Sequence, residues 1–479
     1  MVCYLLNLPD DLLLAILVYL RPQDILSVQQ TCRGLMTFCI TDYLWHSIKI
    51  DFPLNLPHKS KIGDLSGDEL RKLSVTGLHV DRAWRKNPSD LRALNRIKHE
   101  GIVSQMQYLP PKWLVTMSRI QTLVGANCVV SIWDCHSPSS AKRLKHFSFD
   151  TGHGIPEFSA ALSEDSLHVF VVVFGAISKT DILKVYHVPL QSSSFSADHT
   201  TYLLSKITID MVPGVVSKAC ICGETVYYLN ARFATAATML DKPTEFYVCL
   251  LDVRSGKHLE VKIDDPCSHM RLRLFPDSFL LIAGLQSDRT LALRAYNVGK
   301  LLKTLRLLPI DSTSVVPMNL GEPYAKYFSS PSPIKTHEDF ELSSTGHITA
   351  MTFLVGTSNY VARFPIHIDH GVTRFEPGES QLKLFPKLSA NANSELLSLG
   401  HSGQRAVWME HKWDADNFTL KLVKGAFLPG SGPAAVSPLL AGHIALPFEV
   451  RTCQCIALDE AMGRVYLGLY TGEIYVLDL

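Results

Sequence analysis

The sequence predicts a mainly β protein with a small α-helical domain at its N-terminus. Residues 9–20, PDDLLLAILVYL, place nine consecutive apolar residues behind a proline and two aspartates, a pattern typical of the beginning of a helix. From about residue 90 the chain changes to short alternating runs separated by turn residues, and no long helical period follows. With 479 residues and 47% hydrophobic content, the chain can bury the large core that an extended all-β part requires.

Length, charge and hydropathy exclude several kinds of partner. The two longest apolar runs, Leu12 to Leu20 and Val169 to Ile177, have nine residues each, whereas a helix needs about 20 residues to cross a bilayer. The first basic residue, Arg21, follows the first run, so the pattern of a secretory signal is missing. A net charge of +1 provides no general attraction for nucleic acid or an anionic membrane. We therefore expect neither as a partner, and a cytoplasmic or nuclear location.

Known motifs of catalysis, cofactor binding and metal binding are missing from the sequence. The eleven cysteines include no C-x2-C pair, and Cys220 with Cys222, like Cys453 with Cys455, stand two apart, on one face of a strand. We interpret these cysteines as inert buried thiols in a reducing compartment. Residues 367–370 (HIDH) come nearest to a metal cluster, and their spacing favours solvated loop histidines. The sequence thus predicts a chain that is not an enzyme, with no catalytic, cofactor or metal residues.

The first predicted helix runs from about Pro9 to Leu20. Proline suits a first helical position, and the two aspartates suit the positive end of the helix dipole. At 100° per residue the side chains of Leu14 and Val18 form an apolar spot opposite the main stripe, and burying each is worth about 1.5–3 kcal/mol. We expect another surface to cover them. The main stripe comprises Leu12, Leu13, Ile16, Leu17 and Leu20.

Two further short helices are predicted before residue 50. After the break at Arg21 to Gln23, Asp24 can cap a second helix, and Thr41 or Asp42 can cap a third. Three short helices in about fifty residues lie at the lower limit of independent stability, so the domain should need a partner surface. The second helix carries Ile25, Val28, Cys32, Leu35, Met36 and Cys39 on one face, and the third carries Leu44, Trp45 and Ile48.

The helical segment resembles the F-box motif over its whole length. The resemblance rests on Leu8-Pro9, Leu12, Ile16, Leu17, Leu20, Asp24, Leu26, Cys32-Arg33, Leu35 and Leu44-Trp45, and it departs from the family at Asp11, where glutamate is common. It implies that the helices interlock with a Skp-type adaptor that sits on a cullin scaffold. An ordinary three-helix cap packed on its own chain is the alternative. The docking or motif-core positions implied by the match are Leu8, Pro9, Leu12, Ile16, Leu17, Leu20, Ile25, Val28, Cys32 and Trp45.

A connecting segment should separate the helices from the β part. Residues 51–67 (DFPLNLPHKSKIGDLSG) are rich in proline, lysine and glycine, as linkers are. Residues 67–84 resume a helical period with Leu70, Leu73 and Leu78 as apolar positions. We therefore divide the chain into a helical domain (1–50), a linker with a short helix (51–89) and a β domain (90–479).

The β domain is predicted to be a seven-bladed β-propeller. Residues 453–479 contain three strand-like runs joined by glycine-containing turns, which is the pattern of one blade that lacks its fourth strand. Because an open edge invites aggregation, the missing strand should come from Leu91 to Lys98, ahead of the first blade. The repeats resemble WD repeats weakly, since only Trp133-Asp134 keeps the dipeptide. A pair of β-sandwiches, or six or eight blades, are the alternatives. Strand ends similar to Val476-Leu477-Asp478 recur at 131–134, 184–187, 249–252, 294–297, 361–364 and 406–409.

The longest interruption of this repeat is residues 309–346, which we predict to be a structureless loop. Its segment EPYAKYFSSPSPIKTHEDF contains three prolines and exposed aromatic residues. Ser330-Pro331 and Ser332-Pro333, with Lys335 nearby, resemble proline-directed phosphorylation sites. Loops of this length are usually functional or disordered, and disorder is the favoured interpretation here.

Together these features favour the substrate-recognition subunit of a Skp-cullin-F-box ubiquitin ligase. The F-box would dock on the adaptor and the propeller would bind a protein substrate, while catalysis would reside in the associated transferase. The order of the domains is similar to that of the expanded F-box families of fungi. Two alternatives stay open: a scaffold protein that binds the adaptor outside ubiquitination, and a propeller that binds a small ligand or acts as an enzyme.

Overall fold

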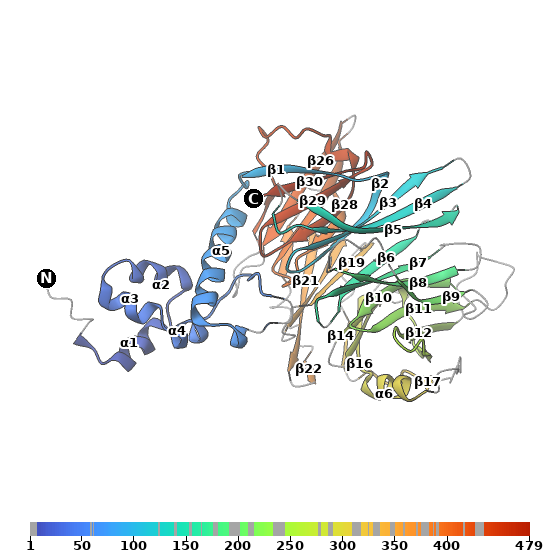
Figure 1. The fold of residues 1–479 in the computed structure, drawn as a ribbon, viewed down its shortest axis with the longest axis horizontal. Coiled ribbons are helices and arrows are strands. Elements are labelled where there is room, and N and C mark those ends of the chain that lie inside the picture. The colour runs from blue at the N-terminus through green and yellow to red at the C-terminus, as the bar shows by residue number, and fades with distance from the viewer. Residues whose placement is uncertain are drawn as a thin grey trace, which may run out of the picture.

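The chain forms a helical domain, a long connecting helix and a β domain (Figure 1). In the described residues the β domain contains seven sheets. Within the described residues, no helix has the length and apolar character that spanning a membrane requires. The computed structural model describes residues 7–57, 60, 62–122, 125–137, 141–152, 156–163, 165–175, 181–190, 202–208, 215–232, 245–275, 279–285, 291–308, 318–323, 325–328, 336–344, 350–357, 360–369, 372–374, 383–386, 388, 392–414, 417–426 and 435–479.

Four helices, rather than the predicted three, precede residue 50 in the described part of the chain. They are α1 (Asp10–Leu17), α2 (Pro22–Gln29), α3 (Arg33–Cys39) and α4 (Asp42–Ser47). The predicted second helix is divided because Cys32 adopts an extended backbone, with φ −158° and ψ 163°. The hydroxyl of Thr31 donates to the carbonyl of Val28 at 2.8 Å and closes the first half. The apolar residues of 25–39 keep a helical spacing across this turn, so their pattern does not reveal it.

The helices enclose a small core of their own. Trp45 is fully buried in it, and its indole N–H donates to the carbonyl oxygen of Cys39 at 2.8 Å. Leu70, which belongs to the next helix, completes the cluster, so the core depends on residues beyond position 50. The buried members are Leu13, Leu17, Ile25, Leu35, Cys39, Leu44, Trp45, Ile48 and Leu70.

The segment predicted as a linker packs against the helices. Phe52 is buried, and its ring lies where a Cβ on Gly77 would approach to 2.7 Å. The backbone N–H of Gly67 donates to the carboxylate of Asp42 at 2.7 Å. The 3-10 turn Ile62–Asp64 lies within this segment. The helical domain therefore includes more of the chain than residues 1–50.

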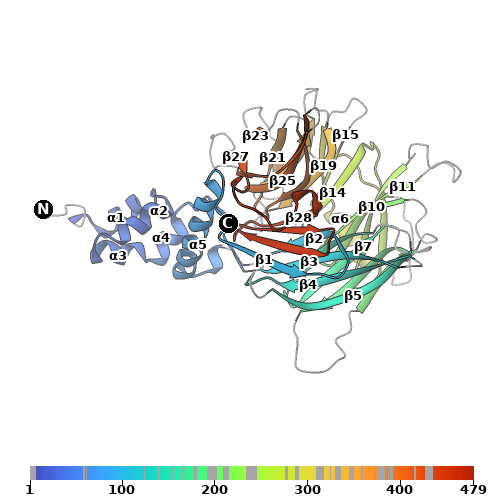
Figure 2. The same cartoon turned by 90° about the horizontal axis from the view of Figure 1, so that it is seen from above.

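Helix α5 (Gly67–Arg85) connects the two parts of the molecule (Figures 1 and 2). Ser66 and Glu69 form a capping box that begins the helix. Its 19 residues span about 28 Å. Leu70 lies in the helical core near one end, and Trp84 lies in a β-domain core near the other. The helix predicted over 67–84 is thus present, and it is shared by two cores.

Seven sheets, numbered here in chain order, make up the described part of the β domain. Sheet 1 contains β2 (Ile102–Leu109), β3 (Trp113–Gln121), β4 (Ala126–Asp134) and β5 (Lys142–Gly152); sheet 2 contains β6 (Glu157–Leu162), β7 (His168–Phe174), β8 (Asp181–Pro189) and β9 (Tyr202–Thr208). Sheet 3 contains β10 (Val215–Cys222), β11 (Thr225–Arg232), β12 (Glu245–Asp252), β13 (His258–Lys262) and β17 (Met318–Asn319); sheet 4 contains β14 (Ser268–Phe275), β15 (Phe279–Leu285), β16 (Leu291–Asn297) and β18 (Ala325–Phe328). Sheet 5 contains β19 (Thr336–Ser344), β20 (Ala350–Thr357), β21 (Tyr360–Asp369), β22 (Val372–Arg374) and β23 (Lys383–Pro386); sheet 6 contains β24 (Asn393–Leu399), β25 (Arg405–Asp414), β26 (Asn417–Ala426) and β27 (Ala435–Pro438). Sheet 7 contains β28 (Cys453–Asp459), β29 (Arg464–Leu469), β30 (Glu473–Asp478) and β1 (Ala93–Lys98), with the 3-10 turn Val450–Thr452 before it.

The sheets follow one another around the β domain (Figure 2). The first strand of each sheet contacts the first strand of the next, in the order β2, β6, β10, β14, β19, β24 and β28, and β28 contacts β2 again. Strand β1 pairs antiparallel with β30, from Ala93 opposite Asp478 to Lys98 opposite Glu473. The open edge of the last sheet predicts this pairing, with the fourth strand supplied by Leu91 to Lys98. Sheet 7 therefore combines strands from both ends of the β domain.

The Trp-Asp dipeptide of sheet 1 belongs to a buried hydrogen-bond network. The indole N–H of Trp133 donates to the hydroxyl oxygen of Thr116 at 3.0 Å, and His99 Nε2 lies 2.8 Å from the same oxygen. His99 directly follows β1, so the network ties the closing strand to the first sheet. Asp134 accepts from Lys112 Nζ at 2.9 Å and from the backbone N–H of His136 at 3.0 Å.

Two expectations about the strands need correction. Residues 406–409 lie on β25, the second strand of sheet 6, whereas the other six recurring ends lie on third strands. A buried second strand carries the same apolar pattern as a third strand, so the sequence does not separate them. The predicted loop 309–346 includes the whole of β17, β18 and β19. Ser330 to Pro333 and Lys335 lie outside the described residues. Helix α6 (Gly299–Leu307), also unexpected, buries Leu301 and Leu305 against sheets 3 and 4.

Candidate functional site

Among the described residues 7–50, six large hydrophobic side chains are uncovered. On α1, Leu12 and Ile16 stand four residues apart and share one side of the helix, and Tyr19 continues that stripe. On α3, Met36 has the same spacing with Ile40, just beyond the helix end. Because these side chains come from a domain with a small core, covering them would add considerably to its stability. Their exposed fractions are Leu12 53%, Ile16 46%, Tyr19 90%, Met36 44%, Ile40 44% and Tyr43 62%.

The side of α1 that faces away from the helical core differs from the one predicted. Leu14 and Val18, expected to need cover from a partner, are half-buried against the helical core. Leu13 and Leu17 point into that core, with exposed fractions of 2% and 3%. The uncovered stripe of Leu12, Ile16 and Tyr19 lies on the opposite side. The run is apolar all round, so no polar residue marks which side faces outward. An uncovered apolar face therefore exists. It contains Leu12 and Ile16, which were predicted to dock, but it does not contain Leu14 and Val18.

The residues expected to bind an adaptor fall into three groups. The buried group forms the domain's own core and can affect a partner only by holding the helices in place. Met36, Ile40, Tyr19 and Tyr43 were not predicted as surface positions, and for Met36 the reason is the turn that divides the second helix. Pro9, Leu12, Ile16 and Cys32 are exposed; Leu8, Leu20 and Val28 are half-buried; Leu17, Ile25 and Trp45 are buried.

Helix α5 is fixed to sheet 6 by hydrogen bonds around its last turn. The indole N–H of Trp84 donates to the carbonyl oxygen of Gly425 at 3.2 Å. The buried ammonium of Lys424 donates to the carbonyl oxygens of Trp84 at 2.5 Å and Lys86 at 2.6 Å, and also to the hydroxyl of Ser89. A cation at the carboxyl end of a helix is also favoured by the helix dipole. The end of α5 is therefore tightly held.

Two buried charges extend this contact to sheet 7. Arg405 is 2% exposed, forms an ion pair with Asp81 of α5 at 3.0 Å and donates to the carbonyl oxygen of Glu460 at 2.8 Å. The Glu460 carboxylate accepts backbone N–H groups of Ser402 at 2.6 Å, Gln404 at 3.0 Å and Arg405 at 2.8 Å. Burial raises the pKa of Glu460 and lowers the pKa of Arg405. These contacts fix the helical domain in one orientation relative to sheets 6 and 7.

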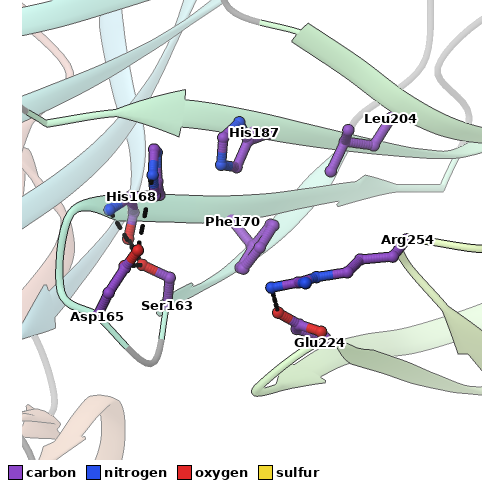
Figure 3. Close-up of a pocket in the computed structure, with 8 residues that line it drawn as sticks. All are labelled: Ser163, Asp165, His168, Phe170, His187, Leu204, Glu224 and Arg254. Carbon is purple, nitrogen blue, oxygen red and sulfur yellow. Dashed lines mark hydrogen bonds and ion pairs between the residues drawn. The ribbon is translucent and has the colours of Figure 1, made fainter.

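A second candidate site is a pocket of about 380 Å³ between sheets 2 and 3 (Figure 3). Its walls are apolar: the rings of His168 and His187 stack at 4.3 Å, and Phe170 lies 5.3 Å from His187. Figure 3 shows Arg254 and Glu224 entering from the neighbouring sheet, where they form an ion pair. The lining residues are Ser163, Asp165, His168, Phe170, His187, Leu204, Glu224 and Arg254.

Charges of both signs stand at the rim of this inter-sheet pocket. The Asp165 carboxylate accepts the Ser163 hydroxyl at 2.5 Å and the Leu167 N–H at 2.9 Å, and these bonds lower the pKa of Asp165. Burial, followed by the charge of His168, lowers the pKa of His187. The Arg254 side chain is 75% exposed. Apolar walls with a mixed polar rim suit a segment of another protein. The sequence predicts no substrate-binding residues, because the pocket depends on how two sheets pack.

The cysteines agree only in part with their interpretation as inert buried thiols. In the described part of the chain every cysteine is free; Cys32 is exposed, and Cys220, Cys222 and Cys455 are half-buried. Cys453 and Cys455 contact different hydrophobic clusters, because a β-bulge between them breaks the alternation. Burial raises the pKa of Cys453 to about 12, which keeps its thiol protonated at neutral pH.

Comparisons with known proteins support the assignment of the N-terminal region. A family model described as F-box-like matches residues 5–51. No curated protein matches the chain. A structural match was found with a chain from the solved structure titled "Crystal Structure of Mitotic Checkpoint Complex". The match covers 82% of this chain and 96% of the other chain, with 10% sequence identity and a TM-score of 0.43. That likeness is too distant to support an argument about fold or function.

Proposed function

We propose that this protein is a substrate-recognition subunit of a Skp-cullin-F-box ubiquitin ligase. The observation that carries the proposal is the uncovered apolar stripe of Leu12, Ile16 and Tyr19 within a region that matches the F-box-like family. F-box domains generally bind Skp-type adaptors, and an adaptor would supply the cover that this stripe lacks. The cullin would be reached through the adaptor, and the complex would act in the cytoplasm or nucleus.

We further infer that the seven sheets are blades of a closed β-propeller that binds a protein substrate. The contacts from β2 around to β28 and back, and the pairing of β1 with β30, support closure. The inter-sheet pocket is the proposed place for a substrate segment. Because α5 is fixed at both ends, a bound substrate would be held at a constant distance and orientation relative to the adaptor. The chain would contribute positioning, which raises the effective concentration of a substrate lysine near the charged ubiquitin carrier, and the transferase would supply the chemistry.

Adaptor binding is tested by co-expressing the full chain with a Skp-type adaptor. We expect a stable complex with wild type and none with Leu12→Asp combined with Ile16→Asp, because two carboxylates would have to be buried without partners. Leu307→Asp is the control, since Leu307 on α6 is 84% exposed and far from the helical domain in sequence. Loss of the complex in the control as well, or its retention in the double variant, would contradict the proposal.

Ubiquitin transfer separates a substrate receptor from an adaptor-bound scaffold. Proteins captured by the β domain should receive ubiquitin in a reconstituted ligase with wild type and not with the Leu12, Ile16 double variant. A complex that binds adaptor and cullin but modifies none of the captured proteins would favour the scaffold. Melting shifts caused by small molecules, with turnover of one of them, would favour the enzyme or ligand-binding alternative.

A further inference from the structure

Three metal-binding side chains converge on sheet 3. They are Cys249 on β12 and His258 and Glu260 on β13, and one ligand atom from each lies within 4.8 Å of the others. The strand pairing explains this, because Cys249 stands directly opposite Glu260 and His258 stands two residues before Glu260, on the same face. The side chains are therefore brought together by a hairpin register and not by a mobile loop.

Two further side chains complete the cluster. Tyr228 stands opposite Cys249 on β11, and its hydroxyl oxygen lies 2.7 Å from His258 Nε2. Arg232 forms an ion pair with Oε2 of Glu260, and Oε1 of the same carboxylate lies 3.9 Å from Cys249 Sγ. One carboxylate oxygen thus faces the arginine, and the other faces the thiol.

We propose that Cys249, His258 and Glu260 form a structural zinc site. Thiolate, imidazole and carboxylate are the donors that zinc takes in proteins, and the sulfur ligand disfavours magnesium and calcium. Cys249 Sγ, a ring nitrogen of His258 and Glu260 Oε1 bind the ion, and the Tyr228 hydroxyl is the neighbour for the fourth position. Arg232 stays on Oε2 and orients the carboxylate.

Protons and charge at this site can be followed explicitly. Binding of Zn²⁺ displaces the Cys249 thiol proton to solvent, and the thiolate and the Glu260 carboxylate offset the two positive charges of the ion. The guanidinium of Arg232, whose side chain is 22% exposed, then carries the remaining net charge of +1. His258 is only half-buried and provides access for the ion. The sequence predicts no metal residues, because the spacing of this cluster, Cys-x8-His-x-Glu, follows no familiar zinc pattern, and the proposed site would replace that prediction.

The experiment measures metal binding by the full chain after removal of metal with a chelator. Titration with Co²⁺, then displacement by Zn²⁺, should show one equivalent and a thiolate-to-cobalt charge-transfer absorption. Cys249→Ser should abolish that absorption and lower the affinity at least about ten-fold. The control is Cys267→Ser, a buried thiol outside the cluster, which should behave as wild type. Absence of the absorption in wild type, or its persistence in Cys249→Ser, would overturn the site.

A second variant guards against a folding defect. His258→Gln keeps a polar group near Tyr228, removes the imidazole ligand and changes a half-buried residue outside the hydrophobic clusters. Zinc should raise the unfolding midpoint of wild type and not that of His258→Gln. An equal shift in both, or none in wild type, would disprove zinc stabilisation. Adaptor binding through Leu12 and Ile16 is independent of either result, so the proposed function stands or fails separately.

Discussion

Asp459 and Glu460 are adjacent buried carboxylates whose surroundings differ. Asp459 is 2% exposed and accepts the N–H of Met462 at 3.2 Å, whereas Glu460 is 3% exposed and accepts three backbone N–H groups and the Ser402 hydroxyl. Burial is the first cause that raises the pKa of Asp459, from 3.8 to about 6. Asp459→Asn and Glu460→Gln should therefore change the stability of the protein in opposite directions.

Asp459→Asn should stabilise the protein at pH 7.5. The folded-state pKa of Asp459 is raised, so its favourable contribution is complete below about pH 4 and is lost as the pH rises through about 6. The amide avoids this loss, and we expect a gain of about 1–3 kcal/mol at pH 7.5 that largely disappears at pH 4.5. Urea unfolding of the full chain at the two pH values measures it. A variant no more stable than wild type at pH 7.5 would show that burying the ionised Asp459 carboxylate does not lower the stability of the protein.

Burial raises the pKa of Glu460 as well, but its carboxylate accepts four hydrogen bonds that an amide cannot all keep, so Glu460→Gln should destabilise the protein by about 1–3 kcal/mol. Glutamine keeps one acceptor oxygen but turns an amide N–H₂ toward a backbone N–H, and it removes a charge that faces buried Arg405. The same urea titration at pH 7.5 gives the measurement. Equal stability of wild type and variant would show that Arg405 is balanced by Asp81 alone.

Helices and strands were predictable where polar residues interrupt the apolar ones. The sequence of α5 alternates charged and apolar positions, and its helix was found within one residue. The run on α1 has no polar residue, so the helix was expected but its outward side was misplaced, as Leu14 and Val18 show. The turn at Cys32 interrupts no apolar period and was missed for the same reason. The pocket depends on how sheets 2 and 3 pack, and the cluster of Cys249, His258 and Glu260 depends on strand pairing; apolar periodicity reveals neither.

At the scale of the element, Trp84 is expected to hold α5 on the β domain. Trp84→Ala should cost about 3–5 kcal/mol, because it empties a buried volume between α5 and sheets 6 and 7 and removes the bond to Gly425. Trp84→Phe, the control, fills most of the volume and should cost much less. Calorimetry of the full chain should show the helical domain melting separately in the alanine variant. One unchanged transition would mean that α5 is held by its polar contacts alone.

At the scale of the whole molecule, β1 should decide whether the β domain stays monomeric. Ile97 is 5% exposed in the cluster between sheets 7 and 1, so Ile97→Asp should release β1 and expose the edge of β30. We expect a lower unfolding midpoint and concentration-dependent association in size-exclusion chromatography. Arg96→Ala, which removes only a partly exposed ion pair with Glu473, should stay monomeric and lose at most about 1 kcal/mol. Monomeric behaviour of Ile97→Asp would show that sheet 7 tolerates three strands.

Helix α5 has a consequence for selectivity if the proposed function holds. A spacer anchored in both cores, through Leu70 and Trp84, cannot swing, so the zone that the transferase can reach is narrow. Two proteins that bind the β domain equally well would then differ in whether they receive ubiquitin, according to where their lysines lie. One whose lysines fall outside that zone would leave unmodified, and while bound it would act as a competitive inhibitor of degradation.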